Sequence, residues 1–129
     1  MTIIKDEVFI FILMLFLHIV DDYYLQGILA NLKQKRWWNE NAPQEKYKND
    51  YIAALMCHSF SWSFMICLPL AIYKYNDYWA TFVLINSIIH MIVDDLKANR
   101  FKINLLQDQF IHFIQICISF LGYLFTTLI

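Results

Sequence analysis

The sequence contains little glycine or proline, with two residues of each in 129. It shows no low-complexity tract and no sign of a second domain, so its length predicts a single domain. The N-terminal stretch has neither a cationic leader region nor a small-residue cleavage site, which favours a retained helix over a signal peptide. No CxxC pair is present, and three single cysteines are expected to be small buried apolar residues: Cys57, Cys67 and Cys117.

Charged residues are also scarce, at 16% of the chain, while 60% of the residues are hydrophobic and 18% are aromatic. A soluble domain of this size has too little interior to bury so many apolar side chains. Four segments approach the roughly 20 residues that a helix needs to cross a hydrocarbon core about 30 Å thick. They cover residues 8–27, 51–73, 78–97 and 103–127. We therefore predict that residues 1–129 form an all-α, integral membrane four-helix bundle.

The cationic residues are concentrated in two of the connections. The long connection, residues 28–50, carries Lys33, Lys35, Arg36, Lys46 and Lys48, and residues 97–102 carry Lys97, Arg100 and Lys102. The opposite side carries only Lys5 and Lys74. The positive-inside rule then places both cation-rich connections in the cytoplasm and both termini on the outer side. The expected location is the inner (cytoplasmic) membrane of the cell.

All four histidines fall inside these predicted spans, and three of them have an aspartate four positions away. The pairs are His18/Asp22, His90/Asp94 and Asp108/His112. Residues four apart share one face of a helix, one turn from each other. In each pair the aspartate lies one turn nearer the cytoplasm than the histidine. His58, in the second span, falls at about the same depth as the other histidines.

An aspartate at the centre of a membrane helix costs roughly 2.5–3.5 kcal/mol, so these carboxylates require partners. A divalent metal ion supplies the missing positive charge, and mixed nitrogen and oxygen ligation suits zinc first, with manganese or iron as alternatives. The predicted ligands are His18, Asp22, His58, His90, Asp94, Asp108 and His112. Seven ligands exceed the needs of one tetrahedral zinc, so the site is expected to hold one or two ions. A metal-free hydrogen-bonded core and a proton or ion path are the alternatives.

Further polar side chains lie beside the predicted ligands. Gln26 continues the face of His18 and Asp22, and Lys97 follows Asp94 by three positions. The expected substrate contacts are Gln26, Lys97, Gln109 and Arg100. Asp21 and Asp95 lie about 100° around their helices and are expected to support the ligands from outside.

Together these positions spell HxxxDxxxQ in the first span, a histidine in the second, HxxxDxxK in the third and DQxxH in the fourth. At these positions the chain resembles a family of small bacterial and phage integral membrane proteins of unknown function. The similarity covers nearly the whole chain and implies a phage or prophage gene, but it implies no reaction. Likeness to membrane proteins described as metal-dependent hydrolases, or to ceramidase-like enzymes with His/Asp zinc sites, is an analogy.

The favoured function is an intramembrane metal-dependent hydrolase that acts near the cytoplasmic leaflet on a lipid or lipid-linked substrate. Asp22 or Asp94 would act as the general base. Cations around the entrance, Lys33 and Arg100 among them, favour a phosphate-bearing substrate. A metal-ion binding or transport protein and a non-catalytic phage membrane factor are the alternatives. Membrane lipid is the expected partner, a homodimer is compatible with the sequence, and no motif indicates nucleic-acid binding.

Overall fold

The computed structural model describes residues 2–74, 77–126 and 128, and every regular element in these residues is helical. In chain order the elements are α1 (Thr2–Ile19), the π-helix η1 (Val20–Leu25), α2 (Leu29–Leu32), α3 (Lys35–Asn41), the 3₁₀ helix η2 (Glu45–Tyr47), α4 (Asp50–Tyr73), α5 (Trp79–Ala98) and α6 (Leu105–Thr126). The predicted all-α class is confirmed.

Four helical stretches are long and apolar enough to cross a membrane. They cover Asp6–Leu25, Glu45–Tyr73, Trp79–Ala98 and Leu105–Thr126, close to the four predicted spans. The fourth span was expected to end at residue 127, which lies outside the described residues. Long apolar sequences of this kind form helices in a membrane because a helix satisfies its own backbone hydrogen bonds.

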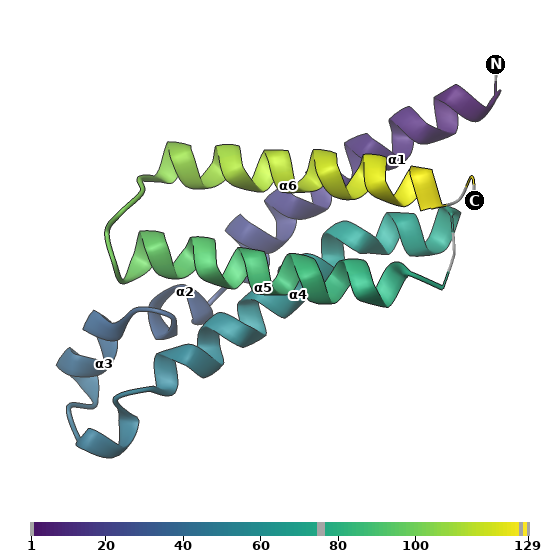
Figure 1. Ribbon diagram of the computed structural model, residues 1–129. Helices are drawn as coiled ribbons and strands as arrows, with labels where there is room; N and C mark the ends of the chain where they lie inside the picture. Colours follow the sequence, from purple (N-terminus) through teal and green to yellow (C-terminus); the bar gives the residue numbers. More distant parts are fainter. Residues whose placement is uncertain (1, 75–76, 127, 129) are drawn as a thin grey trace.

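The four long helices lie side by side in an antiparallel bundle (Figure 1), in which α4 packs against α5 and α1, and α6 packs against α5. One end of the bundle, called here the terminal end, holds the start of α1, the end of α4, the start of α5 and the end of α6. The other end, the loop end, holds α2, α3 and the α5–α6 connection, residues 99–104. The two cation-rich connections of the sequence therefore lie at the same end.

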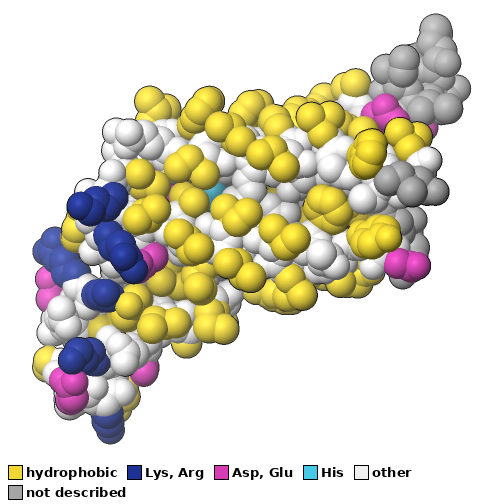
Figure 2. Space-filling view, in the orientation of Figure 1, with side chains coloured by type: hydrophobic (Ala, Val, Ile, Leu, Met, Phe, Trp, Pro, Cys, Tyr) yellow, Lys and Arg dark blue, Asp and Glu magenta, His cyan; other side chains and the backbone are white. Residues whose placement is uncertain are grey.

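The distribution of side chains is inverted relative to a soluble protein. Large apolar side chains cover the face of the bundle seen in Figure 2, and lysines and arginines gather at the loop end. Several apolar residues are more than half exposed, including Ile12, Phe16, Ile88, Ile118 and Leu121. So large an apolar surface requires a partner or a lipid environment. Of the cysteines, Cys67 is buried as expected, whereas Cys57 is exposed, so that prediction is wrong for Cys57.

The interior changes character along the bundle. At the terminal end it is an apolar core made of Ile10, Met14, Trp62, Ile66, Cys67, Leu70, Val83, Ile116 and Tyr123. Towards the loop end buried polar side chains replace these residues.

The end of α1 determines how the chain reaches the loop end. α1 passes into the wider turn of η1, where both Asp21 and Asp22 are buried. Gly27 then adopts a φ of +51°, which glycine tolerates better than other residues. The chain turns there, and α2 packs back against α4.

Candidate metal centre

Histidine and aspartate side chains from η1, α4, α5 and α6 converge in the interior of the bundle. His90, Asp94, Asp108 and His112 have 0% exposure, and Asp22 and His58 are also buried. The i, i+4 spacing on α5 and α6 places the histidine and aspartate of each pair on the inward face. This cluster is the candidate site.

His58 lies at the centre of one side of the cluster. Its Nε2 is 3.3 Å from Asp22 Oδ1, 3.3 Å from Asp94 Oδ2 and 3.2 Å from His90 Nε2. These three atoms come from η1 and α5 and meet around one imidazole nitrogen of α4. Such convergence of nitrogen and carboxylate oxygen is the donor set that zinc, manganese and iron accept.

The other nitrogen of His58 faces away from this meeting point. Nδ1 lies 3.8 Å from Asp21 Oδ2, and Asp21 Oδ1 accepts a hydrogen bond of 2.6 Å from the Ser61 hydroxyl. A carboxylate behind a histidine is the usual support for a metal ligand. Asp21 Oδ2 has no hydrogen-bond partner among the described residues, so the supporting role of Asp21 stays a prediction.

His112 organises the second side of the cluster. Its Nε2 lies 3.3 Å from Asp108 Oδ1 and 3.8 Å from Asp94 Oδ1, and these three buried atoms have no hydrogen-bond partner among the described residues. The second oxygen of each carboxylate is held by a lysine. Lys33 Nζ lies 2.6 Å from Asp94 Oδ2, and Lys97 Nζ lies 2.5 Å from Asp108 Oδ2. Each lysine therefore leaves one carboxylate oxygen directed at His112.

Within the described residues, three groups of buried side chains could hold a metal ion, and in each group the ligand atoms lie within 4.8 Å of one another. The groups are Asp22, His58 and His90; His90, Asp94 and His112; and Asp22, Asp108 and His112. They contain six of the seven predicted ligands.

His18, the seventh predicted ligand, belongs to none of these groups. The Trp62 indole donates to His18 Nδ1 at 2.8 Å, so the proton of the neutral ring lies on Nε2, 3.1 Å from Gln109 Oε1. Gln109 Nε2 in turn donates to Asp22 Oδ2 at 2.9 Å and to Asp108 Oδ2 at 3.0 Å. His18 therefore orients Gln109, and Gln109 holds two of the candidate ligands.

A stack of rings fixes the histidines. Trp62 lies parallel to His90 with ring centroids 4.1 Å apart and an interplanar angle of 17°. His90 in turn stacks on His112 at 4.1 Å and 27°. The indole thus seals the cluster on the side of the apolar core and limits the rotation of the imidazoles.

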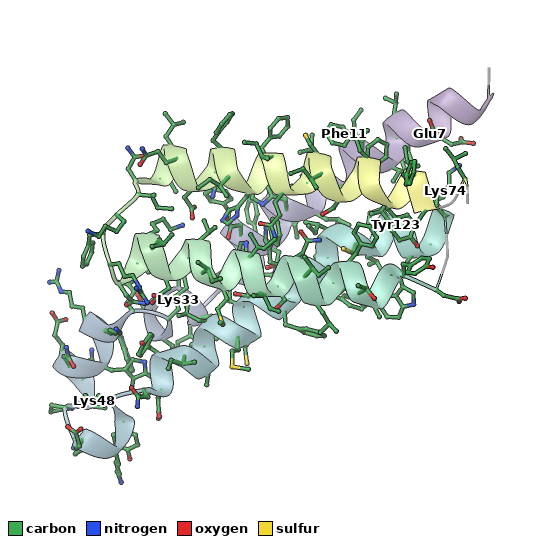
Figure 3. The ribbon with its side chains drawn as sticks, viewed as in Figure 1. Glu7, Phe11, Lys33, Lys48, Lys74 and Tyr123 are labelled. Atoms are coloured by element: carbon green, nitrogen blue, oxygen red, sulfur yellow. The ribbon has the colours of Figure 1, made fainter. Side chains whose placement is uncertain are left out.

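Lys33 was expected to be one of several cations around an entrance, and the structure instead buries it to 5% exposure in the cluster. Figure 3 shows it at the loop end, far from the Glu7–Lys74 pair at the terminal end. Asn99 holds the backbone on both sides: its amide donates to the Lys33 carbonyl at 3.0 Å and accepts from the Lys35 N–H at 2.7 Å. No periodic pattern in the sequence indicates this insertion.

The four predicted substrate contacts lie in different places. Gln109 and Lys97 contact the cluster directly. The Gln26 amide donates to the main-chain carbonyl of Asp22 at 2.7 Å, and this hydrogen bond involves no side chain of the cluster. Arg100 lies outside the cluster, exposed and paired with Asp95 at 2.7 Å.

Comparison of the chain with known protein families, with curated proteins and with solved structures found no match. The cluster itself is therefore the basis for assigning a function.

Proposed function

We propose that this chain is an integral membrane protein whose bundle holds one or two divalent metal ions and hydrolyses a lipid or lipid-linked substrate near the cytoplasmic leaflet. The observation that carries the proposal is the set of overlapping His/Asp groups, buried inside a bundle with an apolar exterior.

The charge of the cluster supports a divalent ion. Asp21, Asp22, Asp94 and Asp108 supply four carboxylates, and among the described residues two buried or half-buried ammonium groups contact this set, those of Lys33 and Lys97. Two negative charges are left over while the imidazoles are neutral. Buried charge without a partner is costly, and a divalent cation balances this excess. The unpartnered oxygen of Asp108, next to His112 Nε2, fits such an ion.

The sharing of ligands limits how two ions can be arranged. An imidazole nitrogen binds one metal ion, whereas a carboxylate has two oxygens and can bridge two ions. The first and third groups share only Asp22, while every other pair of groups shares a histidine. A two-ion centre would therefore use Asp22 as the bridge, with His58 and His90 on one ion and Asp108 and His112 on the other.

That arrangement leaves Asp94 as the general base. Its Oδ2 is held by Lys33, and its Oδ1 has no hydrogen bond and lies 3.8 Å from His112 Nε2. This oxygen can accept a proton from an attacking water. A divalent ion bound nearby would make that water more acidic and polarise the bond to be cleaved. Lys97, 3.8 Å from the same oxygen, would hold an anionic group of the substrate.

Transport of metal ions is less well supported. In the described residues, the buried polar side chains on the terminal side of the cluster are uncharged, namely Ser63, Asn86, Gln115 and Ser119. Beyond them the interior is apolar, with Ile10, Ile66 and Leu70 fully buried. An ion would have no ligands over this half of the bundle.

The hydrolase is tested by reconstituting the purified protein in vesicles of bacterial lipid extract and following lipid products by mass spectrometry. We expect turnover with added zinc, manganese or iron, its loss with a chelator, and a decrease of about 100-fold or more in Asp94→Asn. Asp77→Asn, at an exposed position of the terminal end, should retain full turnover. Equal turnover in Asp94→Asn and wild type would contradict the assignment of the base.

A further inference from the structure

The outer surface between α4 and α5 carries two hollows in line. The first, of about 310 Å³, lies at the loop end between Ile52 and Leu55 of α4 and Met91 and Leu96 of α5. The second, of about 470 Å³, is lined by Met56 and Phe60 of α4 and by Leu84, Ile88 and Met91 of α5. The two hollows share Met91. The second hollow is lined by later residues of α4 and earlier residues of α5, so it lies nearer the terminal end. We call the two hollows together the α4–α5 furrow.

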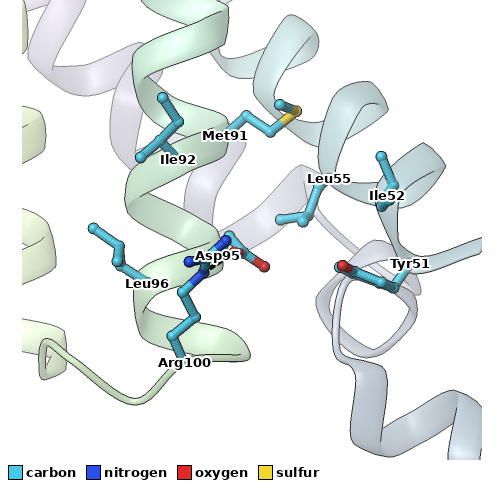
Figure 4. Close-up of a pocket in the computed structure, with 8 residues that line it drawn as sticks. All are labelled: Tyr51, Ile52, Leu55, Met91, Ile92, Asp95, Leu96 and Arg100. Atoms are coloured by element: carbon cyan, nitrogen blue, oxygen red, sulfur yellow. Dashed lines mark hydrogen bonds and ion pairs between the residues drawn. The ribbon is translucent and has the colours of Figure 1, made fainter. Parts of the chain in front are cut away.

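The furrow is amphipathic along its length. Its loop end has polar walls, formed by Asp95, Arg100 and the phenol of Tyr51 (Figure 4). Lys35 Nζ lies over the Tyr51 ring, 4.8 Å from its centroid, and adds a second cation. The hydrogen bond to Asp95 raises the pKa of the Arg100 guanidinium, which therefore stays charged. The second hollow is almost entirely apolar.

We propose that the α4–α5 furrow binds an anionic phospholipid, with the phosphate at Arg100 and Lys35 and an acyl chain along Met91 and Phe60. Two cations and one carboxylate leave a net positive charge at the polar end, which complements a phosphate. Arg100 follows the end of α5 by two residues, at the boundary where head groups meet the hydrocarbon region. A polar, cationic end joined to a long apolar channel matches the shape of a lipid and of few other ligands.

A second groove on the molecule serves as an internal comparison. It lies between α5 and α6, and its volume of about 340 Å³ is close to that of the first hollow. Its lining includes Ile85, Ile89, Ile111, Ile114 and Ile118. No charged residue lines it. It offers an acyl chain the same apolar surface without a site for the phosphate, so it should not discriminate between head groups.

The furrow also adjoins the candidate metal centre. Asp95 lines the furrow, while its neighbour Asp94 points into the cluster, and Leu55 lies one turn from His58. A phosphate at Arg100 would thus lie on the other side of α5 from Lys33 and Asp94. The furrow is therefore a lipid site distinct from the candidate metal centre, and this proposal does not depend on the hydrolase function.

Native mass spectrometry of the full chain in detergent tests the binding, with dioleoyl phosphatidylglycerol and dioleoyl phosphatidylcholine as probes. We expect phosphatidylglycerol to be retained at least about fivefold better, and this preference to be lost in Arg100→Gln. Arg36→Gln removes another exposed arginine, paired with Glu40, and should keep the preference. Ser87→Trp, which fills the second hollow, should weaken the preference for phosphatidylglycerol, whereas Ile114→Trp in the α5–α6 groove should leave that preference unchanged.

Equal retention of the two lipids by the wild type, or equal loss of the preference in Ile114→Trp and Ser87→Trp, would overturn the proposal. Metal content measured on the same samples separates the two proposals. Bound metal without a head-group preference would support the metal centre and refute the furrow as a lipid site. A head-group preference without bound metal would support the furrow and refute the metal centre.

Discussion

At the scale of single residues, the two lysines of the cluster give the two oxygens of each bound carboxylate different contacts. Lys33 and Lys97 each bind one oxygen of an aspartate, and the other oxygen faces His112. The lysines offset part of the buried negative charge and fix the orientation of the carboxylates. The lysines therefore hold these carboxylates in place without a metal ion.

Removal of one of these lysines should be costly in the metal-free protein. Lys33→Met leaves Asp94 buried beside fewer cations, and breaking a buried pair costs about 3–5 kcal/mol. We expect the melting temperature in detergent to fall by roughly 10 °C or more. Saturating zinc should restore much of the loss, because a divalent ion replaces the missing charge.

Lys48→Met provides the matched control, since Lys48 and Glu45 form an exposed pair on η2 with 66% and 85% exposure. Exposed pairs contribute about 0–1 kcal/mol, so little change is expected. Equal melting temperatures for the two variants would show that the Lys33–Asp94 pair does not stabilise the folded protein.

At the scale of elements, the turn after η1 decides which side chains reach the cluster. The π-helix buries Asp21 together with Asp22, and Gly27 redirects the chain so that α2 returns towards α4. Asn99 then holds the backbone beside Lys33. Three local features thus bring a lysine from a polar connection into the interior.

The two glycines should respond to alanine in opposite ways. At Gly27 an added Cβ would meet only the Leu25 carbonyl oxygen, at 3.8 Å, so the cost is the left-handed backbone, about 1–2 kcal/mol. At Gly122, inside α6, alanine is the better helix former by about 1 kcal/mol, and its Cβ would contact the Phe82 ring at 3.4 Å. Thermal unfolding should show Gly27→Ala less stable and Gly122→Ala equal to or more stable than wild type. A loss confined to Gly122→Ala would refute this explanation of the turn.

At the scale of the whole molecule, an apolar exterior and a charged interior fit a bundle surrounded by lipid. The start of α1 and the end of α6 lie at the end opposite the cation-rich connections. The positive-inside rule then predicts termini outside the cell membrane and α2 and α3 in the cytoplasm.

This orientation can be measured by labelling single cysteines in bacterial spheroplasts with a membrane-impermeant maleimide, in a chain whose native cysteines are alanine. Cysteine at Asp77, exposed at the terminal end, should react in intact spheroplasts. Cysteine at Lys48, exposed at the loop end, should react only after lysis. The opposite pattern would invert the topology and place the cluster near the outer leaflet.

Local geometry explains which features were predictable from the sequence. The length of the apolar segments predicted the four long helices, and the i, i+4 spacing predicted which histidines and aspartates share a face. His18 has the same spacing from Asp22, yet it bonds Trp62 and Gln109 because those residues approach from α4 and α6. The burial of Lys33 likewise depends on contacts between distant segments, which no local pattern encodes.

The most direct test of the central claim is the metal content of the detergent-purified full chain by inductively coupled plasma mass spectrometry. Protein prepared without chelator and supplemented with zinc, manganese or iron should carry one or two equivalents. His112→Gln, which alters two of the three candidate groups, should lose most of the metal, whereas His18→Gln, which alters none, should retain it. A folded wild type without bound metal, or equal losses in the two variants, would contradict the account and leave the cluster as a hydrogen-bonded polar core.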